Sequence, residues 1–414
     1  MTGQFASRKR GRLNPAWIVL LAGVSAALHI GKLPPALPVL QRDLGITLVQ
    51  SGFLLSLVQL ASVMLGIVAG LAADGIGLRR CMLMGLWLLC GAGLAGGWAR
   101  DAETLLALRA LEGMGFLLTT IPAPSLVRRI VAPGQLTRMM GFWGAFMPFG
   151  TAMALLLGPL VMGHTGWAGW WWLTASFSAV MALWVQARLP PDERAPAQAS
   201  VSPGTTGWTA RLAQTLQSGG PWLMALTFAT YSAQWLAVIG FLPSLYAQSG
   251  WTGVLGAVLT ALVAAVNIIG NVAAGRLLHR GVPARALLWT GFAVMGVGAF
   301  LAFSSFTDGL PVIRYSGALL FSSVGGLIPG TLFGLASTLA PSERTISTTV
   351  GWMMQWSAAG QLAGPPLVAW VASRMGNWQW TWAVTGSGCV AGMLLAAMIA
   401  RRLAAMARSG HNAV

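Results

Sequence analysis

Twelve apolar stretches, each long enough to cross a lipid bilayer, recur along the 414 residues of this chain. A transmembrane helix needs about 20 consecutive apolar residues. Only 8% of the residues are charged, whereas a soluble domain carries about 25%, so an ordinary soluble protein is excluded. Because helices satisfy their own backbone in lipid, the sequence predicts an all-α membrane protein. The predicted transmembrane helices are 16–40, 51–73, 81–98, 104–127, 139–163, 168–187, 220–247, 252–275, 286–306, 314–338, 348–372 and 379–400.

The basic residues are distributed unequally between the two sides of this predicted membrane plan. With the N-terminus inside, 19 of the 25 Lys and Arg residues fall in cytoplasmic segments and four in outer loops. The positive-inside rule therefore predicts a multi-pass protein of a bacterial cytoplasmic (inner) membrane with both termini in the cytoplasm. The net charge of +16 is then a topology signal, and its spread over separate short loops does not favour a nucleic-acid partner. The first apolar stretch is too long for a cleaved signal peptide.

A polar segment divides the chain into two similar parts. Residues 188–219 are rich in Pro, Ser, Gly and Thr, as linkers are, and a surface helix is expected near Trp208 to Leu216. Three features recur in the second part at nearly the same offset, which suggests a duplicated unit. Gly70 to Arg80 is echoed by Gly275 to Gly281, Gly158-Pro159 by Gly364-Pro365, 206 residues later, and the tryptophans 170–172 by Trp378, Trp380 and Trp382. Parallel six-helix repeats are an architecture of secondary transporters. We expect an N-terminal six-helix bundle in 1–187, a cytoplasmic linker in 188–219 and a C-terminal six-helix bundle in 220–414.

Patterns typical of an enzyme or a metal protein do not occur in the sequence. Cys81, Cys90 and Cys389 lie in apolar stretches without metal-ligand spacing. CxxC, HExxH, GxSxG and Walker A patterns are not found. We therefore expect a protein that is not an enzyme and that uses no cofactor and no metal.

Two segments resemble motifs of the major facilitator superfamily. The first, Gly70-x-x-x-Asp74-x-x-Gly77-x-Arg79-Arg80, follows the second predicted helix and is similar to the family's signature loop. The second, Leu105-x-x-x-Arg109-x-x-Glu112-Gly113-x-Gly115, is similar to its fourth-helix motif. The resemblance covers nearly the whole chain and implies transport by alternating access. It also implies a gating loop formed by Gly70, Asp74, Gly77, Arg79 and Arg80, although the two arginines could serve only to fix topology.

Other segments resemble the cyanate permease and nitroimidazole transporter branch of this superfamily. They are Gly113-Met-Gly115-Phe, Pro124-Ser-Leu-Val-Arg-Arg129 and Met140-Gly-Phe-Trp143-Gly. This resemblance implies a small and often anionic substrate.

Titratable side chains inside the predicted helices are the main candidate functional residues. A charge near the centre of a transmembrane helix costs about 2.5–3.5 kcal/mol. His29 and Lys32 share one face of the first helix, because they are three residues apart. Arg109 and Glu112 have the same spacing on the fourth helix. In the resembled family, both helices line the central cavity.

We therefore expect Lys32 and Arg109 to bind an anionic substrate, since a guanidinium can contact a carboxylate-like group with two hydrogen bonds. Glu112 or His29 would exchange the coupling proton. Structural roles are the alternatives. Arg109 could only pair with Glu112 or extend towards the membrane surface, and Lys32 lies beside prolines that could admit water. His29 could be a packing residue, and Glu112 a counter-ion.

The candidates in the second half of the chain are neutral amides. Gln234 on the seventh predicted helix and Gln355 on the eleventh are expected to form hydrogen bonds with the substrate. The alternative is that they join helices to one another, which is the common use of polar side chains in lipid.

Together these features predict a secondary active transporter for a small, anionic solute, with proton-coupled uptake as the preferred direction. Export of a drug or a nitroimidazole-like compound is the second interpretation. A membrane sensor that does not transport is an alternative from another class. The expected partners are the solute, the proton and the lipid bilayer, and the family resemblance implies a monomer.

Overall fold

The computed structural model describes residues 15–66, 76–192, 208–251 and 253–411, which are almost entirely α-helical. Ten helices of this described part are long and apolar enough to cross a membrane. Helix α9 (Phe146–Arg188) holds two of the predicted spans, since Gly166 breaks it with a φ of 68° and a ψ of 178°. Helix α17 (Ile346–Met375) is 30 residues long but less apolar than the ten. With these additions the described helices match the twelve predicted spans, and the all-α membrane fold is confirmed.

The described helices of spans one to six follow the predicted boundaries closely, with one correction; the predicted end of the second span, 67–73, lies outside the described residues. The fifth span was predicted to begin at residue 139, but it begins at Phe146, because Ala145 (φ −94°, ψ −5°) separates it from a preceding helix. The elements before α9 are α1 (Pro15–Gly31), α2 (Leu33–Leu44), α3 (Leu48–Ser56), the 3-10 turn η1 (Leu57–Gln59), α5 (Leu78–Gly96), α6 (Ala102–Thr120), α7 (Ala123–Ile130) and α8 (Pro133–Gly144).

The second half begins with a short helix in the linker. This helix, α10 (Trp208–Gln217), confirms the helix predicted near Trp208 to Leu216. The remaining elements are α11 (Gly219–Gln248), α12 (Gly253–Ala265), α13 (Asn267–His279), α14 (Ala284–Phe303), η2 (Ser305–Thr307), α15 (Pro311–Gly325), α16 (Leu327–Leu339), η3 (Glu343–Thr345), α17 and α18 (Thr381–His411).

Span one changes from α1 to α2 at Lys32. Pro34 and Pro35 follow in the first turn of α2, and neither has a backbone N–H to donate to the preceding turn. The amide of Lys32 still donates to the carbonyl of Leu28 at 2.7 Å. The prolines therefore interrupt the hydrogen-bond ladder just beyond the residue that carries the buried ammonium group.

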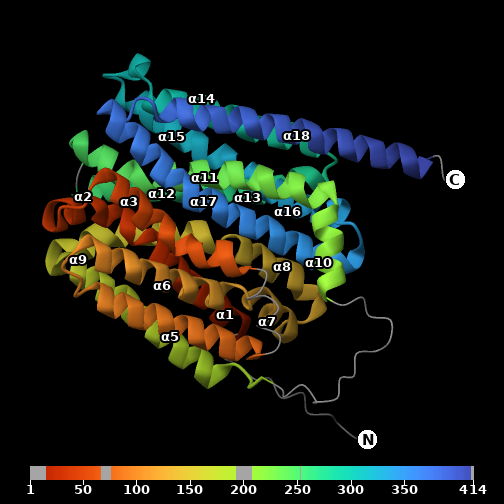
Figure 1. Cartoon of the computed structure of the whole chain (residues 1–414), viewed down its shortest axis with the longest axis horizontal. Coiled ribbons are helices and arrows are strands. Elements are labelled where there is room, and N and C mark those ends of the chain that lie inside the picture. Colours follow the sequence, from red (N-terminus) through yellow and green to blue (C-terminus); the bar gives the residue numbers. More distant parts are fainter. Residues whose placement is uncertain (1–14, 67–75, 193–207, 252, 412–414) are drawn as a thin grey trace, which may run out of the picture.

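The N-terminal and C-terminal helices lie side by side (Figure 1). Helices α1 to α9 occupy the lower part of that view and α11 to α18 the upper part. Across this boundary, α2 packs on α11, α3 packs on α17 and α9 packs on α12. The domain limits at residues 187 and 219 stay a prediction.

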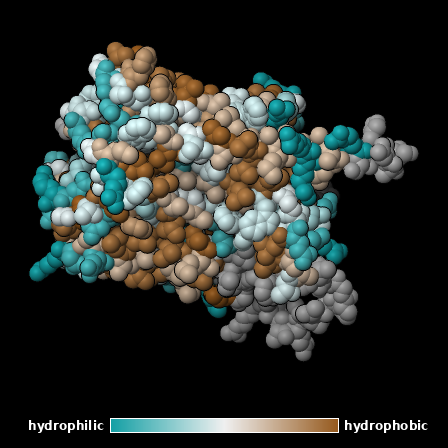
Figure 2. All heavy atoms as spheres, turned by 45° about the horizontal axis from the view of Figure 1, so that its top comes forward, coloured by the Kyte–Doolittle hydropathy of each residue, from teal (hydrophilic) through white to brown (hydrophobic). Residues whose placement is uncertain are grey.

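The surface matches that of a protein surrounded by lipid. Large apolar side chains such as Met64, Ile269 and Leu394 are more than 60% exposed. Figure 2 shows apolar residues across the middle of the visible face, with hydrophilic residues gathered towards its two ends. Exposure of this kind would be unfavourable in water and is the expected surface of transmembrane helices.

Candidate functional site: a buried charge cluster

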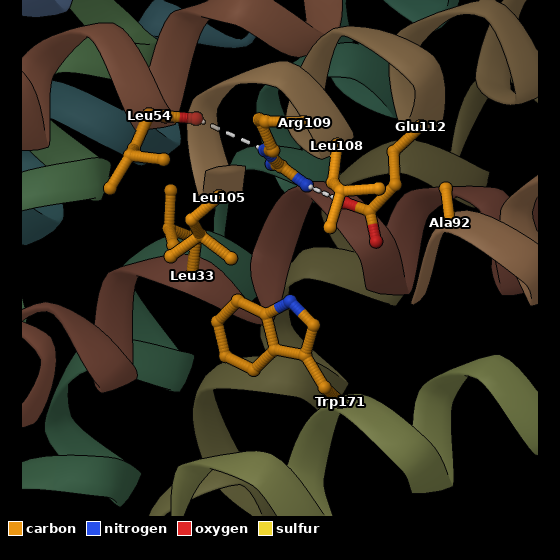
Figure 3. A pocket seen from close by; sticks show the side chains of 8 residues that line it. All are labelled: Leu33, Leu54, Ala92, Leu105, Leu108, Arg109, Glu112 and Trp171. Atoms are coloured by element: carbon orange, nitrogen blue, oxygen red, sulfur yellow. Dashed lines mark hydrogen bonds and ion pairs between the residues drawn. The ribbon is translucent and has the colours of Figure 1, made fainter. Parts of the chain in front are cut away.

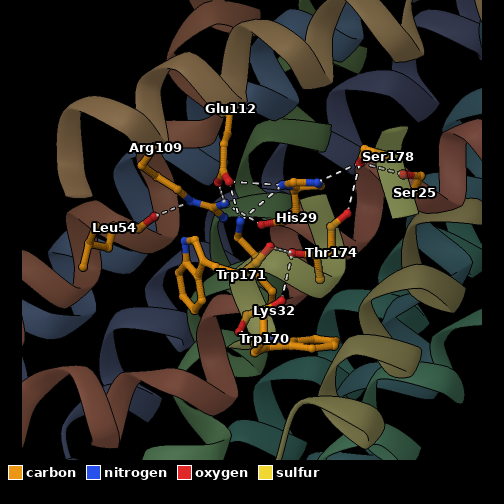
Figure 4. Close-up of polar contacts among 10 residues, drawn as sticks. All are labelled: Ser25, His29, Lys32, Leu54, Arg109, Glu112, Trp170, Trp171, Thr174 and Ser178. Atoms are coloured by element: carbon orange, nitrogen blue, oxygen red, sulfur yellow. Dashed lines mark hydrogen bonds and ion pairs between the residues drawn. The ribbon is translucent and has the colours of Figure 1, made fainter. Parts of the chain in front are cut away.

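Four predicted residues, His29, Lys32, Arg109 and Glu112, meet between the N-terminal helices (Figure 4). His29 lies near the end of α1 and Lys32 follows it at the α1–α2 junction. Arg109 and Glu112 lie one turn apart on α6. None of the four side chains is more than 3% exposed. The structure thus brings together the residues singled out as titratable groups inside predicted spans.

Asp101 caps the N-terminus of α6, the helix that carries Arg109 and Glu112. Its carboxylate accepts hydrogen bonds from the backbone N–H of Thr104 at 2.7 Å and from the Thr104 hydroxyl at 2.9 Å. These bonds hold the pKa of the Asp101 carboxyl below its usual range. An ionised side chain at this position caps the helix and suits the positive end of its dipole.

Glu112 is the common acceptor of the cluster. Its Oε2 pairs with Nη1 of Arg109 at 2.7 Å. Its Oε1 pairs with Nζ of Lys32 and lies 3.1 Å from Nδ1 of His29. One carboxylate therefore neutralises one of two buried cations and holds both in place.

Arg109 also joins helices through backbone carbonyls. Its Nε donates to the carbonyl of Leu54 on α3 at 3.0 Å, and its Nη1 donates to the carbonyl of His29. Its other terminal nitrogen, Nη2, is buried and has no hydrogen-bond partner among the described residues. The predicted pairing of Arg109 with Glu112 is therefore one part of a wider set of contacts.

Lys32 lies between the carboxylate and an aromatic ring. Its Nζ is 4.7 Å from the ring centroid of Trp171, a distance suited to a cation–π contact. The indole N–H of Trp170 donates to the Lys32 carbonyl at 3.0 Å. The tryptophan-rich start of the sixth span thus encloses the lysine.

Two serines complete the cluster, and sequence reasoning did not identify them. Nε2 of His29 lies 2.9 Å from Oγ of Ser178 on α9, and Ser178 Oγ lies 2.9 Å from Oγ of Ser25 on α1. Ser25, His29 and Lys32 are spaced four and three residues apart, so they form one stripe on the first helix. On the sixth span, Trp171, Thr174 and Ser178 are spaced three and four residues apart, so they form a similar stripe on one face of the helix.

A small hollow lies beside Arg109 and Glu112 (Figure 3). The residues that line it are Leu33, Leu54, Ala92, Leu105, Leu108, Arg109, Glu112 and Trp171. They come from N-terminal helices, so the hollow lies within this part of the molecule. Substrate binding by Lys32 and Arg109 stays a prediction.

The two predicted amides lie in different surroundings. Gln234 is 5% exposed, donates to the carbonyl of Thr230 at 2.8 Å and accepts from Sγ of Cys389 at 3.1 Å. The contact with Cys389 joins α11 to α18. Gln355 on α17 donates to the carbonyl of Val63 in the second span at 2.5 Å. A hydrogen bond between Gln59 and Gln361 at 2.8 Å joins the same two spans.

The predicted gating loop is described only in part. Gly70 and Asp74 lie outside the described residues, whereas Gly77, Arg79 and Arg80 lie at the start of α5. The carboxylate of Asp192 accepts from the backbone N–H of Arg79 at 3.0 Å and from that of Arg80 at 2.9 Å. The start of the predicted linker thus caps the helix that follows the loop, a contact the sequence did not reveal.

A multi-pass helical membrane protein with ionic groups buried between its helices is the class that this geometry defines. In the described residues, no group of three or more His, Cys, Asp or Glu side chains is arranged to hold a metal ion. Residues 19–359 match the Major Facilitator Superfamily, and the chain belongs to this family. It is therefore a membrane transporter of small solutes and not an enzyme.

Known relatives are distant in sequence. The chain is 28% identical over 361 residues to the puromycin resistance protein pur8 of Streptomyces alboniger, covering 83% of this chain and 65% of that protein. It is 25% identical over 387 residues to the 2-nitroimidazole transporter of Escherichia coli (strain K12), covering 87% and 90%. The predicted likeness to nitroimidazole transporters is thus confirmed.

A solved structure shows the same fold at lower sequence identity. It is a bacterial homologue of the human lysosomal transporter Spinster, in an inward-facing and unoccupied conformation. The TM-score is 0.73 at 15% identity, with 94% of this chain and 96% of that chain covered.

Proposed function

We propose that the protein is a proton-coupled carrier that exports small organic compounds across the cytoplasmic membrane by alternating access. The observation that carries this proposal is the cluster of four titratable side chains between transmembrane helices. Ionic groups in such surroundings are costly and usually belong to ion or proton pathways.

The contacts of the cluster support a coupling role. Its hydrogen bonds and ion pairs join α1, α3, α6 and α9. Adding or removing one proton changes which of these bonds can form, because each donor and acceptor has a fixed capacity. The packing of several helices therefore depends on the charge state of one site, as coupling requires.

The direction of transport is inferred from the relatives. One of them is a puromycin resistance protein and another is a 2-nitroimidazole transporter. Resistance by a membrane transporter is most simply explained by export. We therefore prefer export to the anion uptake that the sequence favoured. A second reason for this preference is that Lys32 and Arg109 are both already paired with Glu112.

Purified protein in liposomes tests this function, with puromycin and 2-nitroimidazole as probes. An imposed pH gradient should drive accumulation of a probe, and a pH-sensitive dye inside the vesicles should report counterflow of protons. A Glu112→Gln variant should lose the gradient-driven component. Binding of the probes without any movement would contradict the proposal and favour a sensor.

Proton-coupled uptake of an anion is the second candidate. Two observations favour it: the surplus of one positive charge and the buried Nη2 of Arg109, which has no partner in the described residues. Uptake of labelled cyanate or a small carboxylate in the same vesicles tests it. Absence of uptake would remove this candidate, and unchanged uptake after both Lys32→Ala and Arg109→Ala would remove substrate binding by these two residues.

A further inference from the structure

We infer that the proton exchanged at this site is held by the Lys32–His29 pair while Glu112 stays ionised, and that Ser178 is a positioning residue for His29. The inference rests on the proton coupling proposed above. It specifies which groups of the cluster carry the proton and which neutral side chain holds His29 in position for the exchange.

Charge counting is the first step. With Lys32 and Arg109 charged, Glu112 ionised and His29 neutral, the cluster has one positive charge without a counter-charge. An unpaired charge is unfavourable at a site that is this deeply buried. Protonating Glu112 would raise the surplus to two, whereas loss of one proton from a base would make the cluster neutral. The count therefore favours exchange at a base.

The identity of the base follows from chemistry and distance. An arginine guanidinium is not deprotonated in proteins, which leaves Lys32 and His29. Nζ of Lys32 lies 3.3 Å from Nδ1 of His29, and both nitrogens face Oε1 of Glu112. The two bases can hold one proton between them. It binds to the pair from water and returns to water, and no other bond is made or broken.

Ser178 can serve His29 in each of its protonation states. A hydroxyl has one hydrogen to donate and two lone pairs to accept. When Nε2 is bare, the Ser178 hydroxyl can donate to it over 2.9 Å. When Nε2 carries a hydrogen, Ser178 Oγ can accept it and turn its own hydrogen to the carbonyl of Thr174 at 3.3 Å. Ser25, at 2.9 Å, can donate to Ser178 in both states.

The ring of His29 is enclosed by groups from each helix packed near it. On α5 the neighbour is Gly93, where an added Cβ would lie only 3.1 Å from Cε1 of the ring. The charged groups that contact the ring are Lys32 from the α1–α2 junction and Glu112 from α6, while Arg109 from α6 donates to the backbone carbonyl of His29. Ser178, from α9, is thus the neutral partner at Nε2.

Isotope-labelled protein tests the inference without any substrate. The chain has only two lysines, Lys9 and Lys32, so ¹⁵N-lysine labelling with Lys9→Arg leaves one ammonium signal. ¹⁵N-histidine labelling, with His29→Gln for assignment, reports the ring. Both signals should titrate together between about pH 5 and about pH 9. An infrared band of a protonated carboxyl that appears in this range and is lost in Glu112→Gln would overturn the inference.

Variants of Ser178 test the positioning role. Ser178→Ala removes a hydrogen bond to a charged ring and should move the shared titration to lower pH by about one unit. Ser178→Thr keeps the hydroxyl and should restore it. Ser56→Ala is the matched control, because among the described residues this buried serine donates only to the carbonyl of Phe53, at 3.2 Å. Equal shifts in Ser178→Ala and Ser56→Ala would refute the role.

The two proposals fail separately. If neither probe moves in liposomes but the Lys32 and His29 signals titrate together, the export proposal falls and the assignment of the proton stands. If probes move with protons but the infrared band assigns the proton to Glu112, the export proposal stands and the assignment of the proton to the Lys32–His29 pair falls.

Discussion

At the scale of single residues, Glu112 determines the ionic balance of the cluster. Two cations and one imidazole converge on its carboxylate. Removing a partner from a buried ion pair leaves an uncompensated charge, which costs about 3–5 kcal/mol. Removing Lys32 leaves Arg109 and Glu112 paired, whereas removing the charge of Glu112 leaves two cations unpaired.

We therefore predict that Glu112→Gln lowers thermal stability more than Lys32→Met does. Unfolding of the detergent-purified variants, followed by tryptophan fluorescence, measures the difference. Glu103→Gln, an exposed change in the first turn of α6, should leave the transition in place. A larger loss in Lys32→Met would show that Glu112 is not the centre of the cluster.

At the scale of elements, apolar length predicted the spans but not their rotation about their own axes. Every predicted span has its helix, because about 20 apolar residues are a strong local signal. The partners of His29 were not predictable in the same way, since Ser178 is 149 residues away in the sequence. Lone serines are common in transmembrane helices, and only packing decides which one meets a ring.

The cap on α5 is a second long-range contact, and it yields a prediction. Asp192→Ala removes the acceptor for the backbone N–H groups of Arg79 and Arg80. Loss of a helix cap costs about 1 kcal/mol, so amide hydrogen exchange in the first turn of α5 should become several-fold faster. Asp43→Ala removes an exposed partner of Arg42 and should change nothing there. Equal exchange in both variants would mean that the cap contributes little.

The close approach of α3 to α17 depends on the absence of a side chain at Gly52. A Cβ there would lie 2.8 Å from Cα of Pro366, and backbone cannot move aside as a flexible side chain can. We predict that Gly52→Leu separates the two helices and exposes the neighbouring buried Ser51. Maleimide labelling of Ser51→Cys should then rise. Gly91→Leu, at a position with open space, is the control, and equal labelling in both would refute the prediction.

At the scale of the whole molecule, the two halves meet through α2 on α11, α3 on α17 and α9 on α12. The family resemblance implies that such contacts part and re-form during alternating access. The hydrogen bond of 2.8 Å between Gln59 and Gln361 joins η1, which directly follows α3, to α17. A covalent cross-link between these two positions would therefore hold the two halves together.

Cross-linking of Gln59→Cys to Gln361→Cys should stop probe transport in liposomes. A short reagent that joins thiols through disulfides allows reduction, which should restore transport. The same treatment of Ser232→Cys with Ser357→Cys, which lie in the C-terminal part and touch each other, should be tolerated. The native cysteines Cys81, Cys90 and Cys389 are buried and poorly accessible to the reagent. Full activity of the cross-linked Gln59–Gln361 pair would contradict rocking of the halves.

The position of Lys32 at the α1–α2 junction has a mechanical consequence. Its side chain belongs to the charge cluster, while the helix that begins at Leu33 rests against α11 of the opposite half. A small tilt of α2 would thus draw the ammonium group away from its carboxylate, and a change in ionic attraction would pull on α2 in return. Under the proton coupling proposed above, a single lysine would transmit a change in charge to the contact between the two halves of the carrier.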